Sequence, residues 1–391
     1  MTNLPQGWEV KKLGEIGEIV TGSTPSKSNL DFYGKDYPFF KPSDFEQGYF
    51  LENAGDNLSK LGFDKARQLP PKTILVVCIG SLGKVALTRV IGSCNQQINA
   101  IIPHKNIIAE YIYYYCISSK FQSILFSKAP QTTLAILNKT EFSKLEIIYP
   151  KDIKEQERIV GILDESFAKI DESIKILEQN LLNLDELMQS ALQKAFNPLK
   201  DNAKENYKLP QSWEWKSLEE ISENISAGGD KPKNCTESKT AKNQIPVYAN
   251  GVNNNGLVGY TDKATIIKPS LTISARGTIG FVCIRKEPYF PIVRLISLIP
   301  CENILCLHYL YFCLNFFIAK GEGSSIPQLT IPKFKSLQIP LPPLKEQEQI
   351  AEHLDFVFEK AKALKELYTK ELKDYEELKQ SLLDKAFKGE L

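Results

Sequence analysis

Two short motifs contain residue types that could bind nucleotides or support methyl transfer. The stretch CIGSLGKV (78–85) resembles a phosphate-binding loop, but Cys78 replaces its first glycine and Val85 stands where a serine or threonine would coordinate magnesium. We therefore predict a turn between two apolar runs. The stretch FNPL (196–199) resembles the Asn-Pro-Pro-aromatic motif of amino-methyltransferases, but it lacks the second proline, and no glycine-rich cofactor loop lies upstream. We interpret Asn197-Pro198 as the end of a helix.

Cysteine and histidine residues offer a third possible site. Cys306, His308 and Cys313 are close in sequence, but their spacing fits an apolar helix face better than a set of metal ligands. The 8 cysteines occur mostly in apolar runs and form no CxxC pair, which predicts buried, reduced thiols. The sequence also suggests no nucleophile–base pair. These observations favour a binding protein over a catalyst.

The chain contains a long internal repeat. LPQGWEVKKLGEI (4–16) returns as LPQSWEWKSLEEI (209–221), and GSLGKVAL (80–87) has a counterpart in RGTIGFVCI (276–284). Later blocks match more closely: KEQERI (154–159) answers to KEQEQI (345–350). The order is the same in both halves, while the spacing of equivalent positions falls from 205 to 191 residues. The sequence therefore predicts a tandem duplication whose central regions have diverged.

Composition and charge set limits on the protein class. With 42% hydrophobic and 24% charged residues over 391 positions, the chain has the composition of a globular protein of two or three domains. No apolar stretch approaches a membrane span, and the N-terminus lacks a signal-peptide pattern, so we expect a cytoplasmic protein. The net charge of +1 is uneven: residues 154–196 carry −4 and 345–391 carry −3, against +3 and +5 for the other two regions. This mild basic bias is compatible with a polyanion partner.

The two acidic stretches predict long helices. Apolar residues from Leu163 to Ala195 alternate steps of four and three, which is a heptad seam. The second stretch, about 346–388, has a broader apolar stripe, which indicates more than one partner helix. Glutamates at positions such as Glu155 and Glu346 occupy the first turns, where the helix dipole favours negative charge.

Two equal helices in one chain can pack on each other. If a two-fold axis relates the repeats, the helices run antiparallel and each supports one globular unit. Duplex DNA also has dyads perpendicular to its axis, so such a protein can place one unit on each of two half-sites.

The sequence resembles the specificity subunit of type I restriction-modification enzymes. The resemblance covers nearly the whole chain. It rests on the two opening phrases, on TGSTPSKSNLDFYG (21–34), on IPVYANGVNNNGLVGYTD (245–262) and on PLPPLKEQEQIAEHLD (340–355). One departure is that IIYPKDIKEQERI (147–159) lacks the Pro-Leu-Pro-Pro that precedes the second helix.

The resemblance implies an α+β protein: two globular target recognition domains joined by two long helices that form an antiparallel coiled coil, with a pseudo-two-fold internal repeat. It implies a non-catalytic, sequence-specific subunit that binds an asymmetric bipartite double-stranded DNA target. Its expected partners are two methyltransferase subunits and the restriction/translocase subunits. We expect no cofactor on this chain, with S-adenosylmethionine, ATP and Mg on the partners. The expected domains are recognition domain 1 (1–153), helix 1 (154–196), recognition domain 2 (197–344, with a linker at 197–208) and helix 2 (345–391).

If the chain reads DNA, base contacts should come from polar side chains in the divergent regions, because base edges are read by Arg, Lys, Asn, Gln, Ser and Thr. Arg276 is the strongest candidate, since two nearby glycines give a tight turn that could present it outward; the alternative is a buried salt bridge. The candidates in the first half are Ser23, Thr24, Lys27, Ser28, Asn29, Lys41, Ser43, Lys84, Asn95, Gln96, Gln97, Gln131, Thr132 and Thr133. The candidates in the second half are Lys231, Lys233, Asn234, Asn253, Asn254, Asn255, Arg276, Arg294, Ser324 and Ser325.

The repeated opening phrase has a different expected role. Because it is shared by both halves, its apolar residues should pack each domain against the helices rather than read bases. Outward apolar positions on the second helix, Leu364 and Leu367, are the predicted contacts for the methyltransferase. Two other interpretations remain open: a coiled-coil scaffold that assembles proteins without reading DNA, and a fused single-chain restriction enzyme or methyltransferase, which the incomplete motifs disfavour.

Overall fold

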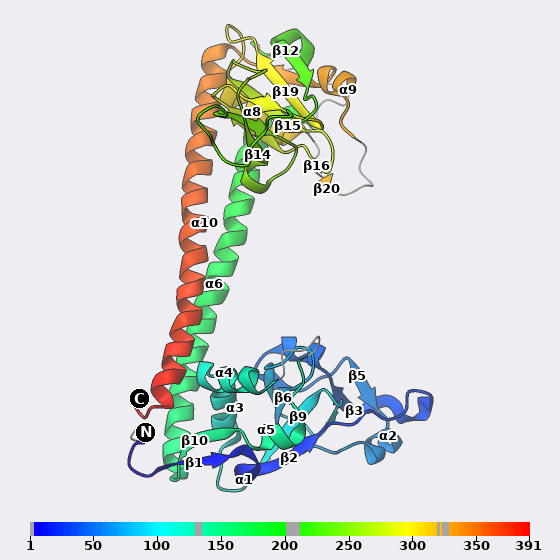
Figure 1. Cartoon of the computed structure of the whole chain (residues 1–391), viewed down its shortest axis with the longest axis vertical. Coiled ribbons are helices and arrows are strands. Elements are labelled where there is room, and N and C mark those ends of the chain that lie inside the picture. The colour runs from blue at the N-terminus through cyan, green and yellow to red at the C-terminus, as the bar shows by residue number, and fades with distance from the viewer. Residues whose placement is uncertain (1–3, 130–134, 201–211, 319–320, 323–327) are drawn as a thin grey trace. The chain divides into compact units, whose positions relative to one another are not determined.

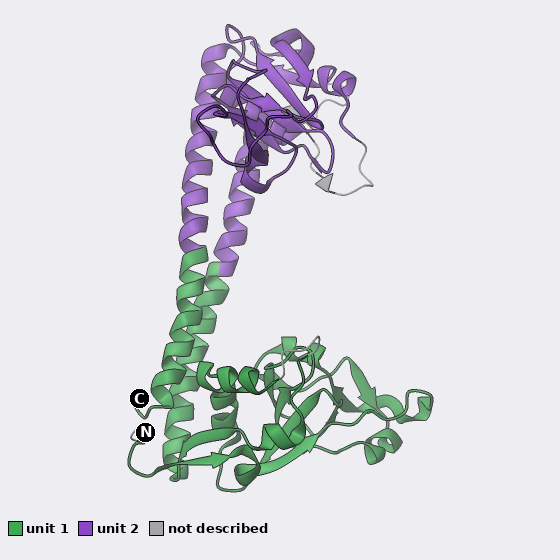
Figure 2. Ribbon diagram, in the orientation of Figure 1, with its two compact units in different colours: residues 1–177, 369–391 green, residues 178–368 purple. Residues whose placement is uncertain are grey.

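A computed structural model of the chain describes residues 4–129, 135–200, 212–318, 321–322 and 328–391. The chain forms two compact units, coloured separately in Figure 2. Unit 1 consists of residues 1–177 and 369–391, and unit 2 of residues 178–368. Each unit therefore combines one set of strands and short helices with segments of both long helices (Figure 1).

Unit 1 opens with a strand that pairs with the strand preceding the first long helix. β1 (Trp8–Lys12) is antiparallel to β10 (Glu146–Pro150), and α1 (Leu13–Ile16) leads into β2 (Gly17–Thr21). The other strands are β3 (Tyr33–Phe40), β4 (Phe50–Leu51), β5 (Asp56–Leu58), β6 (Ile74–Val77), β7 (Val85–Thr88), β8 (Ser93–Cys94) and β9 (Ile98–Pro103). They form a sheet of order β2-β9-β6-β7-β4 and a smaller one of order β5-β3-β8. The helices are η1 (Leu30–Phe32), η2 (Pro42–Gln47), α2 (Lys60–Lys65), α3 (Ala109–Ile117), α4 (Ser119–Lys128), α5 (Lys139–Ser143) and α6 (Ile153–Lys200).

Unit 2 repeats this order of elements. β11 (Glu214–Ser217) is antiparallel to β21 (Gln338–Leu341), and α7 (Leu218–Ile221) leads into β12 (Ser222–Ala227). The other strands are β13 (Ile245–Tyr248), β14 (Leu257–Thr261), β15 (Ser270–Ser274), β16 (Thr278–Ile279), β17 (Val282–Arg285), β18 (Phe290–Pro291), β19 (Leu295–Pro300) and β20 (Gly321–Glu322). The sheets have orders β12-β19-β15-β17 and β14-β13-β18, with β16 paired to β20. The helices are η3 (Asn253–Gly256), α8 (Leu307–Phe317), α9 (Ile331–Lys335) and α10 (Leu344–Ala386).

The repeated opening phrase packs on the long helices in both units, as predicted. In unit 1, Leu13 and Ile16 are buried in one cluster with Leu163 of α6 and Leu383 of α10. In unit 2 the equivalent Leu218 and Ile221 share a cluster with residues of both helices: Leu192, Phe196, Ala351 and Leu354. Burial of these apolar side chains attaches each set of strands to the helices.

The long helices are antiparallel within each unit. In unit 1, the Asp171 carboxylate on α6 accepts an ion pair from Lys379 of α10 at 2.6 Å, and Arg158 donates to the carbonyl oxygen of Leu391 at 2.9 Å. In unit 2, Asp185 pairs with Lys365, and Leu192 shares a core with Leu354. The predicted seam is confirmed, because its alternate members Leu163, Ile170, Leu177 and Leu184 are all buried.

One predicted boundary is wrong. Asn197-Pro198 does not end the first helix, because α6 continues to Lys200. Proline removes one backbone donor and crowds the carbonyl four residues earlier, which disfavours a helix without forbidding its last turn. The prediction for the cysteines is half right. Cys78, Cys94, Cys116 and Cys313 are buried, whereas Cys235, Cys283, Cys301 and Cys306 are partly exposed; all are free thiols.

A buried glutamine anchors the start of each long helix. The Gln156 side chain donates to the carbonyl oxygen of Pro150 at 2.9 Å and accepts from the Ile108 backbone N–H at 2.9 Å. Gln347, its counterpart, donates to Pro342 at 2.7 Å and accepts from Cys306 at 2.9 Å. Each glutamine is fully buried. The KEQE motif shared by both halves thus has a structural role at its glutamine.

Candidate nucleic-acid interface

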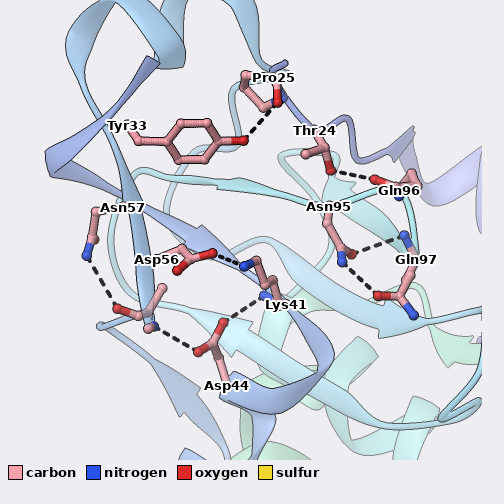
Figure 3. Close-up of polar contacts among 12 residues, drawn as sticks. Thr24, Pro25, Tyr33, Lys41, Asp44, Asp56, Asn57, Asn95, Gln96 and Gln97 are labelled. Carbon is pink, nitrogen blue, oxygen red and sulfur yellow. Dashed lines mark hydrogen bonds and ion pairs between the residues drawn. The ribbon is translucent and has the colours of Figure 1, made fainter. Parts of the chain in front are cut away.

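In unit 1, several predicted residues meet where β2 ends beside the β8–β9 connection. The backbone N–H of Ser23 donates to Cys94 at 3.0 Å, so the loop after β2 lies against residues 94–97. The Thr24 hydroxyl donates to the Gln96 side chain at 2.5 Å, and both residues are exposed (Figure 3). Thr24 and Gln96 therefore present paired polar groups at this edge.

The two neighbours of Gln96 are bound within the protein. Asn95 is only 7% exposed; it donates to the Gln97 side chain at 2.8 Å and accepts from the Gln97 backbone N–H at 3.0 Å (Figure 3). Gln97 in turn donates to the carbonyl oxygen of Ile79 at 3.4 Å. Asn95 and Gln97 brace this connection, and Gln96 is left facing outward.

The predicted lysines of unit 1 differ in their surroundings. Lys41 pairs with Asp56, and its backbone N–H donates to Asp44 at 2.7 Å (Figure 3). Lys84 pairs with Glu46, and the hydrogen bond from Lys84 lowers the pKa of that carboxyl. Lys27 is exposed. Acidic neighbours thus partly compensate Lys41 and Lys84, but no acidic partner of Lys27 occurs among the described residues.

The remaining predicted residues of unit 1 lie in loops. Ser43 is exposed in η2, and the Ser28 hydroxyl is 2.7 Å from that of Ser26. Asn29 accepts from the Asp31 backbone N–H at 3.1 Å and so caps η1. The predicted residues Gln131, Thr132, Thr133, Ser324 and Ser325 lie outside the described residues.

In unit 2, two exposed arginines lie on neighbouring segments. Arg276 follows β15 in a turn completed by Gly277 and Gly280, whose φ angles are 80° and 78°. The Ala275 N–H donates to the carbonyl oxygen of Arg294 at 2.9 Å, which joins the two segments. Within the part of the chain that the structure describes, neither guanidinium has an acidic partner. The alternative prediction, a buried salt bridge at Arg276, is therefore wrong.

Arg294 also has an unusual backbone conformation. Its φ of 72° is in the left-handed region, which is uncommon for a long side chain. Such strain is found at functional sites more often than elsewhere.

The predicted asparagines form a braced loop. Asn253, Asn254 and Asn255 are exposed, and the latter two have φ values of 48° and 51°. Arg285 donates to the carbonyl oxygen of Asn255 at 2.6 Å, and its guanidinium lies 3.5 Å from the centre of the Tyr248 ring. Arg285 is only 8% exposed. Sequence analysis missed this positioning residue; the available signal was a lone arginine at the end of an apolar strand.

A separate polar group lies on the loop before β13. Lys231 and Lys233 are exposed. The Asn234 side chain donates to Asp262 at 2.5 Å, and this bond lowers the pKa of the Asp262 carboxyl. Asn234 thus fixes its loop to β14.

The two candidate edges share one backbone frame. Hydrogen bonds in unit 1 recur at equivalent positions in unit 2, so that Gln97 corresponds to Arg294 and Ile79 to Arg276. The predicted turn at 78–85 is confirmed as the counterpart of the Arg276 turn. The matched bonds are Gly22 N to Ile98 O and Gly228 N to Leu295 O; Asn95 N to Phe40 O and Ile292 N to Tyr248 O; Cys78 N to Gln97 O and Ala275 N to Arg294 O; Gly83 N to Val77 O and Gly280 N to Ser274 O; Leu137 N to Cys78 O and Leu329 N to Ala275 O.

The predicted partner contacts are exposed. Leu364 and Leu367 on α10 have exposed fractions of 39% and 56%. His308, weighed above as a metal ligand, instead contacts Asp355 at 2.6 Å through Nδ1. Over the described ranges, no group of three or more His, Cys, Asp and Glu side chains could hold a metal ion. Among those residues, likewise, no helix has both the length and the apolar character needed to span a bilayer.

Comparison with known proteins gives consistent matches. The family model described as "Type I restriction modification DNA specificity domain" matches residues 5–182 and 210–373. The HindI specificity subunit of Haemophilus influenzae is 37% identical over 191 residues, which are 47% of this chain and 42% of that protein. The chain thus spans less than half of that relative. The MjaIX specificity subunit of Methanocaldococcus jannaschii is 24% identical over 395 residues, with 91% and 88% covered.

Solved structures show the same fold. A chain from a study of "complex assembly and conformational transition of the type I R-M system" aligns with a TM-score of 0.83 at 20% identity, covering 100% of both chains. The HsdS subunit of Thermoanaerobacter tengcongensis aligns with a TM-score of 0.61 at 20% identity, covering 100% of this chain and 98% of that one.

Proposed function

The chain belongs to the type I restriction-modification DNA specificity family, and from this premise we propose that its two units bind the two halves of an asymmetric, interrupted DNA target. Unit 1 presents Thr24 and Gln96, and unit 2 presents Arg276, Arg294 and the asparagine loop. These groups can donate and accept hydrogen bonds at base edges in the major groove. Exposed lysines such as Lys27 supply sequence-independent attraction to phosphates.

The observation that carries this proposal is the shared backbone frame of the two candidate edges. A common frame holds equivalent positions in the same local geometry, while side chains at those positions differ: Gln97 against Arg294, and Ile79 against Arg276. Two units of one architecture with different side chains are what an asymmetric bipartite target requires. A scaffold that never reads DNA would have no such requirement.

We also propose that this chain assembles with two methyltransferase subunits and with restriction/translocase subunits. Catalysis would belong to those partners, together with S-adenosylmethionine, ATP and Mg. The incomplete phosphate-loop and methyltransferase motifs at Cys78–Val85 and 196–199 support this division. We further expect the complex to act in the cytoplasm.

The test is DNA binding by the chain in complex with its methyltransferase. The target would first be identified by mapping methylated positions in a host that carries the complete system. Fluorescence anisotropy should then show affinity for that duplex well above the affinity for a scrambled duplex, and a steep fall with salt. Equal affinity for both duplexes would favour the protein-assembly scaffold instead.

A further inference from the structure

Each unit contains an open cavity at an equivalent position. In unit 1 the cavity is about 690 Å³ and is lined by Tyr113 and Tyr114 of α3 together with Asp164 and Phe167 of α6. In unit 2 the cavity is about 750 Å³. Its lining includes the counterparts of those four residues: Tyr311 and Phe312 of α8, and Asp355 and Phe358 of α10. The duplication has therefore produced the same concave site twice.

The two cavities share an aromatic wall. In unit 1 the rings of Tyr114 and Phe167 meet edge to face, with centroids 5.3 Å apart. In unit 2 Phe312 and Phe358 meet in the same way at 5.1 Å. Ring faces and edges of this kind offer a surface on which a flat apolar or cationic group can stack.

Each aromatic wall has one carboxylate beside it, held by a different donor. The Tyr114 hydroxyl donates to Asp164 Oδ1 at 2.6 Å. Phe312 replaces that tyrosine in unit 2, and His308 Nδ1 contacts Asp355 Oδ2 at 2.6 Å instead. The aspartate is thus retained in both repeats although its intramolecular partner differs. Among the described residues, the other oxygen of each carboxylate has no hydrogen-bond partner.

The nearby lysines do not occupy these carboxylates. In unit 1, Lys379 lines the cavity and pairs with Asp171 at 2.6 Å. In unit 2, Lys365 lines the cavity and pairs with Asp185. A free carboxylate oxygen beside aromatic rings fits a guanidinium group, which stacks on rings and donates to carboxylates from its edge. An ammonium group has no flat face to stack.

We propose that each cavity receives an arginine side chain from one methyltransferase subunit, so that Asp164 and Asp355 anchor two copies of the same partner. The inference rests on the proposed function, in which two methyltransferases assemble on this chain. A site that occurs twice in one chain fits two copies of one protein better than two different proteins, because equivalent surfaces bind equivalent partners.

The experiment uses the full chain, its cognate methyltransferase and native mass spectrometry. Asp164→Asn and Asp355→Asn remove the charge but keep an oxygen that can accept from Tyr114 or His308, so the fold should persist. Each single variant should bind one methyltransferase copy where the unaltered chain binds two. The double variant should bind at least tenfold more weakly overall. Asp374→Asn, an exposed aspartate on α10 outside both cavities, is the matched control and should bind two copies.

The outcomes separate the two levels of inference. Two bound copies with unchanged affinity in both single variants would overturn the arginine sites and leave the proposed function intact. No binding by the unaltered chain would overturn the proposed partner and this inference with it. Circular dichroism of each variant should match the unaltered chain, and a lost helical signal would call for Phe167→Leu and Phe358→Leu, which should give the same stoichiometry.

Discussion

At the scale of single residues, Arg294 combines backbone strain with an unpaired charge. A left-handed conformation costs a residue with a Cβ about 1–2 kcal/mol, and glycine avoids that cost. Glycine in turn loses about 0.5–1 kcal/mol through the entropy of the unfolded chain. We therefore expect Arg294→Gly to leave the free energy of unfolding unchanged or to raise it by up to about 1 kcal/mol.

DNA affinity should respond in the opposite direction to this substitution, because the guanidinium is lost. Urea unfolding and anisotropy on the same preparation would check both effects. A drop in stability with unchanged affinity would assign Arg294 a structural role.

Arg276 gives a second prediction at this scale. Asn250 donates to the Arg276 carbonyl oxygen at 2.8 Å, so truncating the side chain should leave the turn in place. If Arg276 contacts a guanine, Arg276→Ala should cost about 1–3 kcal/mol of DNA binding and relax one base position of one half-site. Methylation mapping would show the relaxed position, with the exposed Lys263→Ala as a charge-matched control.

The other outcomes for Arg276→Ala are distinct. A uniform loss over all sequences, with a shallower salt dependence, would identify a phosphate contact. Unchanged affinity and salt dependence would exclude a role in DNA binding.

Sequence analysis identified the loops that carry candidate residues but could not sort the residues within them. In the run Asn95-Gln96-Gln97, the outer two are bound inside the protein and the middle one is exposed. That alternation depends on hydrogen bonds to Ile79, which is distant in sequence. Arg285 was missed for the same reason, because its partners Asn255 and Thr272 come together only in the folded sheet.

At the scale of elements, the buried glutamines connect each long helix to the strands. Gln347→Met keeps the length of the side chain but leaves the Cys306 N–H and two carbonyl oxygens without partners. Each buried unsatisfied group costs about 1–3 kcal/mol, so we expect a loss of about 3 kcal/mol in the free energy of unfolding. Urea unfolding would measure it.

The control for this prediction is Gln349→Met, because Gln349 is exposed two residues further along the same helix. It should change stability by less than about 0.5 kcal/mol. Equal effects of the two substitutions would contradict an anchoring role for Gln347.

The helices themselves were largely predictable from sequence. A heptad pattern depends only on local spacing, and the seam from Leu163 onward is buried as expected. The end of α6 was predicted wrongly, since a single Asn-Pro pair is a weaker signal than the long helix that precedes it. The glutamine of KEQE was visible as a repeated residue, but nothing local indicated that it is buried.

At the scale of the whole molecule, α6 and α10 each belong to both units. α6 passes from unit 1 to unit 2 after Leu177, and α10 passes from unit 2 to unit 1 after Tyr368. Inserting one heptad into each helix at these points adds about 10 Å of helix and keeps the seam in phase. Because duplex DNA rises about 3.4 Å per base pair, we expect the uncontacted spacer of the target to lengthen by about 3 base pairs.

Methylation mapping of the doubly extended protein would test this expectation. Both half-site sequences should remain as they were. A heptad added to α6 alone has no matching segment in α10, and it should lower stability instead. An unchanged spacer in the doubly extended protein would show that the helices do not set the distance.

The division of the chain into units has a consequence for synthesis on the ribosome. Unit 2 is one continuous segment, whereas the core of unit 1 includes Leu383, Ala386 and Phe387 from the end of α10. The first part of unit 1 must therefore wait until all of unit 2 has been translated, about 10–40 s at about 5–20 residues per second. During that interval its apolar surface is uncovered, and a nascent chain stalled within α10 would be a target for chaperones and proteases.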